Sequence, residues 1–228
     1  MVPHWVRGKE SAMLVAPRRR VLPMLGLGGS VGTPKEGLTA EVLVVDSFAD
    51  LKAKAARAKG KMVLFNLPFT NYRETVIVRS VGAIEAAKVG AVASLIRSVG
   101  PFSMQTPHTG NMRYDDKVKR IPHAALSVED ALMLARMQSR GETIRVRLKM
   151  EARTLPPAKS RNVIAEIRGH EKPNEIVIVS GHIDSWDVGQ GAMDDGGGCL
   201  AAWEAARLIM KSGLKPRRTI RVVLWTNE

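Results

Sequence analysis

Short apolar runs alternate with helical patterns through the middle of the chain. Residues 41–46 and 61–65 are dominated by Val, Leu and other apolar residues, as in buried strands, and residues 47–59 between them have a helical pattern. Ser47 is a candidate N-cap for that helix, and Gly60 is a candidate stop signal. Further strands are predicted at residues 91–96, 122–126 and 143–149, and further helices at residues 81–89 and 128–139. This alternation predicts an α/β unit.

The last third of the chain has the same pattern. Residues 175–181 and 219–226 are predicted to be buried strands, and the helix between them, residues 198–211, is apolar around most of its circumference, as in a helix that packs on a sheet. Residues 162–167 predict one more strand. The final strand is expected to leave an unpaired apolar edge, so that the carboxyl end of the isolated chain aggregates or is partly molten.

The candidate chemistry lies where the strand of residues 175–181 ends. Residues two apart on an extended chain point to the same side, so His182 and Asp184 leave the strand together, at the end where open α/β sheets bind ligands. Imidazole and carboxylate are both zinc ligands, and Asp194 can bridge two cations about 3.5–4 Å apart. Asp184 is expected to orient His182 instead of binding metal directly.

The second strand of this region ends at Glu228, the last residue of the sequence. A carboxylate there is a candidate general base, which takes a proton from water and passes it to the leaving amine. Catalytic zinc normally has three protein ligands, and the sequence supplies fewer. We therefore expect the chain to be truncated through its active site.

The stretch Ser180–Gly198 contains His-Ile-Asp and Gly-Ala-Met-Asp-Asp-Gly, and it resembles the zinc peptidases with co-catalytic metals. The resemblance implies an α/β fold: the start of a three-layer αβα zinc-exopeptidase domain with an inserted protease-associated domain. Residues 1–37 would be the N-terminal segment of the peptidase domain, residues 38–157 the protease-associated-like insertion, and residues 158–228 the first, incomplete part of the peptidase domain.

The same resemblance assigns roles to single residues. His182 would bind one zinc ion, Asp194 would bridge two zinc ions, Asp184 would support the histidine, and Glu228 would be the general base. The peptide bond between Asp194 and Asp195 would be cis. The glutamate that follows the base in this family, and its later aspartate and histidine ligands, have no counterpart in the chain.

The function that the resemblance implies is a metallo-exopeptidase that hydrolyses dipeptides or short peptides with two Zn²⁺ ions. A homodimer in a secreted or lysosomal location is implied as well. No signal peptide pattern is present. The resemblance implies a leader and a pro-region upstream of residue 1. The alternative is a truncated chain without activity, whose remaining function is binding through the protease-associated-like domain.

Composition changes this interpretation little. Lys and Arg number 35 against 22 Asp and Glu, a net charge of +13, but the basic runs Arg18–Arg20, Arg145–Lys149 and Lys215–Arg218 are dispersed. They are not accompanied by zinc-finger spacing or an RNA-binding aromatic motif, so no nucleic-acid partner is expected. No apolar stretch is long enough to predict a membrane span. The single cysteine, Cys199, allows no intramolecular disulfide.

Other features are assigned structural roles. The glycine-rich residues 26–32 imitate a dinucleotide-binding loop, but Pro34 and Gly37 interrupt the place of its helix. His108 and His123 have no neighbouring ligand at a metal-binding spacing, so we expect polar surface or core roles for them.

Overall fold

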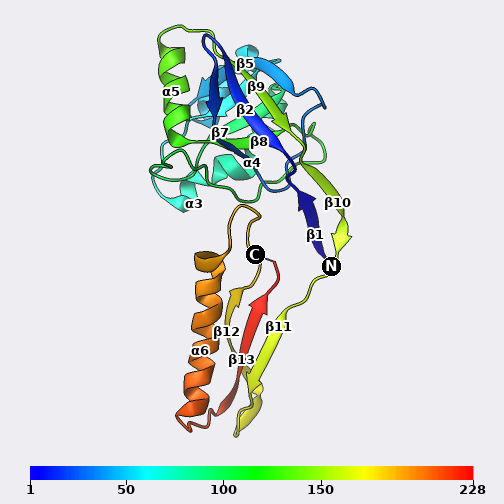
Figure 1. Cartoon of the computed structure of the whole chain (residues 1–228), viewed down its shortest axis with the longest axis vertical. Helices are drawn as coiled ribbons and strands as arrows, with labels where there is room; N and C mark the ends of the chain where they lie inside the picture. Colours follow the sequence, from blue (N-terminus) through cyan, green and yellow to red (C-terminus); the bar gives the residue numbers. More distant parts are fainter. Residues whose placement is uncertain (228) are drawn as a thin grey trace. The chain divides into compact units, whose positions relative to one another are not determined.

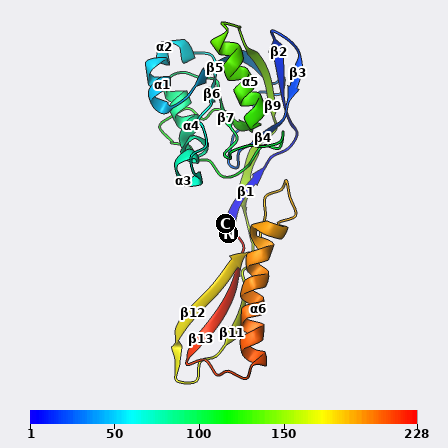
Figure 2. The ribbon, with the colours of Figure 1, turned by 90° about the vertical axis from the view of Figure 1, so that its left-hand side faces the viewer.

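The computed structural model describes residues 1–227 of the chain (Figures 1 and 2). It contains two compact units. One consists of residues 4–156, and the other of residues 1–3 together with the chain from residue 157 onward. Each unit has its own sheet, and the two are described separately.

The unit of residues 4–156 is built on an eight-stranded mixed sheet with the strand order β3-β2-β9-β5-β6-β7-β8-β4. Its strands are β2 (Glu10–Ala16), β3 (Arg20–Leu22), β4 (Met24–Gly26), β5 (Leu38–Val45), β6 (Met62–Phe65), β7 (Ala93–Arg97), β8 (His123–Leu126) and β9 (Arg145–Met150). Strands β5 to β8 are parallel to their neighbours within that group, whereas β2, β3, β4 and β9 pair antiparallel. The α/β class predicted from the alternating pattern is confirmed.

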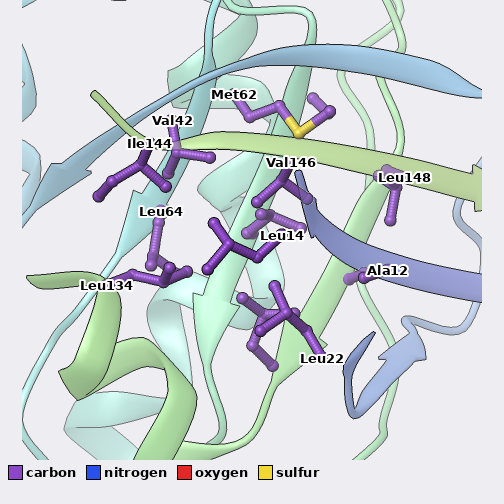
Figure 3. Close-up of a cluster of buried hydrophobic side chains, with 14 of the residues drawn as sticks. Ala12, Leu14, Leu22, Val42, Met62, Leu64, Leu134, Ile144, Val146 and Leu148 are labelled. Atoms are coloured by element: carbon purple, nitrogen blue, oxygen red, sulfur yellow. The ribbon is translucent and has the colours of Figure 1, made fainter. Parts of the chain in front are cut away.

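Helices cover both faces of the parallel part of this sheet. They are α1 (Phe48–Ala53), α2 (Ala55–Ala58), α3 (Tyr72–Thr75), α4 (Ile77–Lys88) and α5 (Val128–Ser139). Side chains of α5, such as Leu134, pack with Leu64 and Val146 in one buried cluster, which Figure 3 shows. Side chains of α1 and α4 pack with Leu43 and Phe65 in a second cluster on the opposite face. The unit therefore has a core on each side of its sheet.

Local signals set the helix ends in this unit. The Ser127 side chain accepts a hydrogen bond from the Asp130 backbone N–H at 3.1 Å, so Ser127 is the N-cap of α5. Ser47 caps α1 in the same way. The single helix predicted over residues 47–59 is interrupted at Lys54, where α1 ends and the short α2 begins.

The structure places the first 37 residues differently from the predicted division of the chain. Residues 4–37 lie in the compact unit of the middle block, because β2 pairs with β9 along its length and β4 pairs with β8. Strand β10 (Arg153–Ala158) runs across the predicted domain boundary at residues 157–158 and pairs with β1 (Val2–Val6). Prolines are tolerated there because a two-stranded ribbon consists only of edge strands.

The second unit contains a three-stranded sheet of order β11-β13-β12 and one long helix. Its elements are β11 (Val163–Ile167), β12 (Lys172–His182), the irregular turn η1 (Ala192–Gly196), α6 (Gly197–Lys211) and β13 (Arg218–Trp225). Strand β13 pairs parallel with β12 and antiparallel with β11. The expectation that the final strand forms an unpaired edge is therefore wrong, because β11 occupies its second side.

The helix α6 covers one face of this small sheet. Cys199 and Ala202 are its buried residues, while Leu200 and Met210 are exposed. In the described residues no helix has both the length and the apolar character needed to cross a lipid bilayer.

Candidate metal centre

The candidate site lies at the carboxyl ends of the parallel strands β12 and β13. His182, the last residue of β12, is paired with Trp225 of β13, and the Ile183 backbone N–H donates to the Trp225 carbonyl at 2.6 Å. Gly181 precedes the histidine. A Cβ at this position would lie 2.6 Å from the Cys199 backbone nitrogen, so only glycine lets the start of α6 approach the strand this closely.

The structure brings together three of the four predicted site residues. The His182 Nε2 atom lies 3.0 Å from Asp194 Oδ1, although the two residues belong to different elements. The His182 Nδ1 atom lies 3.0 Å from the backbone carbonyl of Asp184 and 3.4 Å from its carboxylate. Contacts from Asp184 therefore fix the imidazole ring, with Nε2 directed at Asp194. The fourth residue, Glu228, lies outside the described residues.

Asp195 has a positioning role that the sequence interpretation missed. Its carboxylate accepts hydrogen bonds from the backbone N–H of His182 at 3.2 Å and from that of Gly198 at 3.0 Å. It therefore ties the end of β12 to the first turn of α6. The peptide bond between Asp194 and Asp195 is cis, as the resemblance implies. The sequence signal for this role was an acidic residue just before the start of a helix, because carboxylates accept hydrogen bonds from the free backbone N–H groups of a first helical turn.

The donor types at this site fit zinc, but their number does not complete a zinc site. Two donors on one tetrahedral zinc ion lie roughly 3.3 Å apart, given zinc–ligand bonds of about 2.0–2.1 Å. The separation between His182 Nε2 and Asp194 Oδ1 is close to that value. Within residues 1–227, however, no group of three or more His, Cys, Asp or Glu side chains is arranged to hold a metal ion.

The other candidate side chains have structural surroundings. His123 is fully buried, with Nδ1 3.2 Å from the Ser94 carbonyl and Nε2 3.1 Å from the Arg79 carbonyl. Burial lowers the pKa of His123 to about 4, against the opposing effect of these carbonyls. His108 is exposed and lies beside the Arg79 guanidinium. Burial, and the nearby charge of Asp195, raise the pKa of the Cys199 thiol, which donates to the His182 carbonyl at 3.2 Å.

Comparisons with known sequences agree with the motif at this site. Residues 162–228 match the profile of Peptidase family M28. The chain is 61% identical over 227 residues to carboxypeptidase Q of Xenopus laevis and 57% identical over the same length to carboxypeptidase Q of Homo sapiens. Each match covers the whole chain and 48% of the relative, so the chain spans about half the length of these relatives.

Comparisons with solved structures point to the same fold. The peptidase M28 precursor of Shewanella amazonensis is 39% identical, with a TM-score of 0.93 over 98% of this chain and 52% of that one. BSAP, a zinc aminopeptidase of Bacillus subtilis, is 24% identical, with a TM-score of 0.64 over 98% of this chain and 48% of that one, a likeness of fold alone.

Proposed function

We propose that this chain forms part of a zinc-dependent metallo-exopeptidase that cleaves dipeptides or short peptides. The chain is similar to carboxypeptidase Q over its whole length, and residues 162–228 match Peptidase family M28. The observation that carries this proposal is the 3.0 Å approach of His182 Nε2 to Asp194 Oδ1 at the carboxyl end of β12. An imidazole and a carboxylate that converge at such a sheet end form a binding site for a divalent cation.

The described residues divide the work at this site. His182 and Asp194 would hold the metal, with Asp194 as the bridge between two ions. Asp184 would fix the imidazole so that Nε2 keeps its lone pair toward the metal, since Nδ1 donates its proton to the Asp184 carbonyl. Zinc, when bound, supplies Lewis acidity toward the scissile carbonyl and toward water.

Glu228 is the proposed general base and would move a proton from water to the leaving amine. Trp225, three residues earlier, pairs with His182, so the chain reaches the metal-binding end of the sheet just before Glu228. This register is the support for the role. Asp195 and Gly181 would act by holding the start of α6 against the end of β12.

Zinc content and hydrolysis of a dipeptide panel test the proposal, measured on the purified protein and on its His182→Ala and Asp194→Ala variants. We expect both variants to lose bound zinc and at least 100-fold of the activity, because even outer partners of metal ligands cost about 10–100-fold. His170→Ala is the matched control: His170 lies in the same unit and its exposed ring contacts the Pro216 carbonyl and the Glu171 carboxylate, away from the site.

Two results would count against this function. Zinc content that is unchanged in His182→Ala would remove the metal site from this strand end. Activity that is unchanged in Glu228→Gln would leave the metal site in place and remove the general base. Asp184→Asn keeps the backbone carbonyl and removes only the carboxylate charge 3.4 Å from Nδ1, so kcat should fall by about ten-fold, the low end for such outer partners, while zinc stays bound.

We also propose that the unit of residues 4–156 is the protease-associated-like domain inserted in the peptidase domain. Its support is the pairing of β1 with β10, which places the entry and exit of this contiguous unit side by side. The homodimer and the secreted or lysosomal location are further proposals from the resemblance. Light scattering of the purified protein and fractionation of the source cells test them.

A further inference from the structure

The fold brings one basic run of the sequence, Arg145–Lys149, next to a basic residue from a distant segment, Arg19. Arg145, Arg147 and Lys149 alternate with buried residues along β9, so all three project from the same face of the eight-stranded sheet. In the neighbouring hairpin, the Arg19 guanidinium lies 3.9 Å from the Met13 sulfur atom, and Met13 is the partner of Arg147 in the register of β2 and β9. We call these four cations, Arg19, Arg145, Arg147 and Lys149, the basic face.

The basic face lies on the part of the sheet that helices leave open. Strands β2, β3 and β9 contribute their inward residues, such as Leu14 and Leu148, to the cluster covered by α5 (Figure 3). The second buried cluster, with α1 and α4, contains no residue of β2, β3 or β9. The outward side chains of β9 are exposed for the same reason.

The cations of this face have no acidic partners. Among the described residues, neither Arg19, Arg145, Arg147 nor Lys149 forms an ion pair; Arg147 instead donates to the Glu36 backbone carbonyl at 3.0 Å. Gly37, the residue after Glu36, lies beside both Arg147 and Lys149: a Cβ on Gly37 would lie 3.6 Å from Arg147 Nε and 3.6 Å from Lys149 Cβ.

Three of the four acidic residues around the face have partners of their own, and the fourth, Glu36, is exposed. The carboxylates that flank these strands in sequence are Glu36, Glu41, Glu142 and Glu151. Glu41 is paired with Lys61, and Glu142 with Arg140. Glu151 accepts a backbone hydrogen bond. The face therefore keeps its positive charge, unlike the small sheet, where Arg217, Arg218 and Arg221 are all paired with glutamates.

We propose that the basic face binds a linear sulfated polysaccharide. Three cations in one row, about 7 Å apart along the strand, match an extended polyanion with charges at regular intervals. Guanidinium groups bind tetrahedral oxyanions through paired hydrogen bonds. The outward residues beside the cations are Ser11, Met13, Ala16, Val21, Thr39 and Glu41. Glu41, the one carboxylate among them, lies opposite Arg145 in the register and is paired with Lys61.

This composition favours a polysaccharide over other polyanions. None of those six residues is aromatic, so single-stranded nucleic acid would find no stacking platform. Val21 is the one exposed large apolar residue among them, which gives little to insert below the headgroups of an anionic membrane. Recognition through charge and hydrogen bonding alone suits sulfate groups.

The test uses the full chain, a fluorescein-labelled heparin octasaccharide and fluorescence anisotropy at several salt concentrations. The variant R145Q/R147Q/K149Q is expected to bind at least about ten-fold more weakly at low salt, and the slope of log K against log salt should fall by about two to three, because each lost cation no longer releases a counter-ion. The matched control is K159Q/R161Q/K215Q, which removes the same charge from exposed residues without ion pairs in the other unit. It should change the affinity by less than about two-fold.

A second measurement needs no substitution. Bound octasaccharide should protect Lys149 from acetylation by an N-hydroxysuccinimide ester while Lys215 stays reactive. Equal losses in the two triple variants would reduce the effect to net charge and overturn the proposal. Equal or tighter binding of anionic vesicles or of a single-stranded oligonucleotide, with the same loss in the β9 variant, would overturn the choice of partner.

Discussion

The two sheets of this chain differ in how much of their apolar surface is covered. The eight-stranded sheet has a buried cluster on each side, and side chains such as Leu64 and Phe65 have no exposed surface. Within residues 1–227, α6 is the one helix that packs on the three-stranded sheet. Ile178 on it is 51% exposed, and Trp203 on α6 is 52% exposed.

This difference has a structural consequence for the smaller unit. An apolar groove of about 150 Å³ lies between α6 and β11 and is lined by residues such as Trp203, Met210 and Ile220. Contiguous exposed apolar surface of this kind usually marks an interface or an aggregation hazard. The unit that carries the candidate metal centre is therefore expected to be the less stable of the two.

The largest expected difference in the free energy of unfolding comes from two alanine substitutions, one on the sheet of each unit. Leu64→Ala removes a side chain without exposed surface and should lower the free energy of unfolding of its unit by about 2–5 kcal/mol. Ile178→Ala removes a half-exposed side chain and should cost less than about 1 kcal/mol. Hydrogen exchange read by mass spectrometry reports the two units separately. Equal costs would show that the small sheet is buried in solution.

The stability of the larger unit is expected to fall at acid pH because of His123. Its pKa is about 4 in the folded chain, below the ordinary value of 6.5, so folding favours the neutral ring. This contribution to stability is complete above pH 6.5 and is lost as the pH falls toward 4, by up to about 3 kcal/mol. Urea unfolding at pH 7.5 and pH 5 measures the loss, which His123→Phe should reduce.

His170→Gln is the control for that experiment, because His170 is exposed and lies in the smaller unit. The substitution leaves the larger unit untouched, so the pH dependence of that unit's unfolding should be the same as in the unsubstituted protein. If His123→Phe keeps the full acid sensitivity, the ring is not the group that titrates, and the two carbonyls beside it hold it in the charged form.

The sequence predicted the elements whose signals are local. Helix α5 has the predicted bounds because Ser127 supplies a cap and the helix buries one regular face. The approach of His182 to Asp194 was also predicted from the sequence, since strand alternation and the motif place both residues at one sheet end. These signals need no knowledge of the rest of the fold.

The missed features depend on contacts distant in sequence. Strand β2 pairs with β9 about 135 residues later, and no pattern in the first 37 residues specifies that partner. The central place of β13 depends on β11, more than 50 residues earlier. The basic face was dispersed in the sequence for the same reason, because β9 and the hairpin that carries Arg19 become neighbours only in the sheet.

Within the smaller unit, Asp195 is expected to matter more than any surface pair. Asp195→Ala leaves the backbone N–H groups of His182 and Gly198 without their acceptor and should cost roughly 1–2 kcal/mol. Hydrogen exchange at these two amides should rise, whereas Asp195→Asn keeps one acceptor oxygen and should show part of the effect. Unchanged exchange at both amides would contradict the positioning role.

The smallest expected change in the free energy of unfolding comes from single arginines, either paired in the small sheet or without an acidic partner on the basic face. Arg221 pairs with Glu166 across β13 and β11, and both side chains are partly exposed, so Arg221→Gln should cost about 0.2–1 kcal/mol. Arg147→Gln removes a cation without an acidic partner and should cost less, because only one bond to a backbone carbonyl is lost. A double-mutant cycle of Arg221 with Glu166, followed by urea unfolding, gives the coupling energy directly. A coupling energy near zero, together with a higher stability of Arg147→Gln, would mean that like-charge repulsion on β9 is a larger electrostatic effect in this chain than ion pairing on β13. That result is expected if the row of cations serves to bind a ligand and does not stabilise the fold.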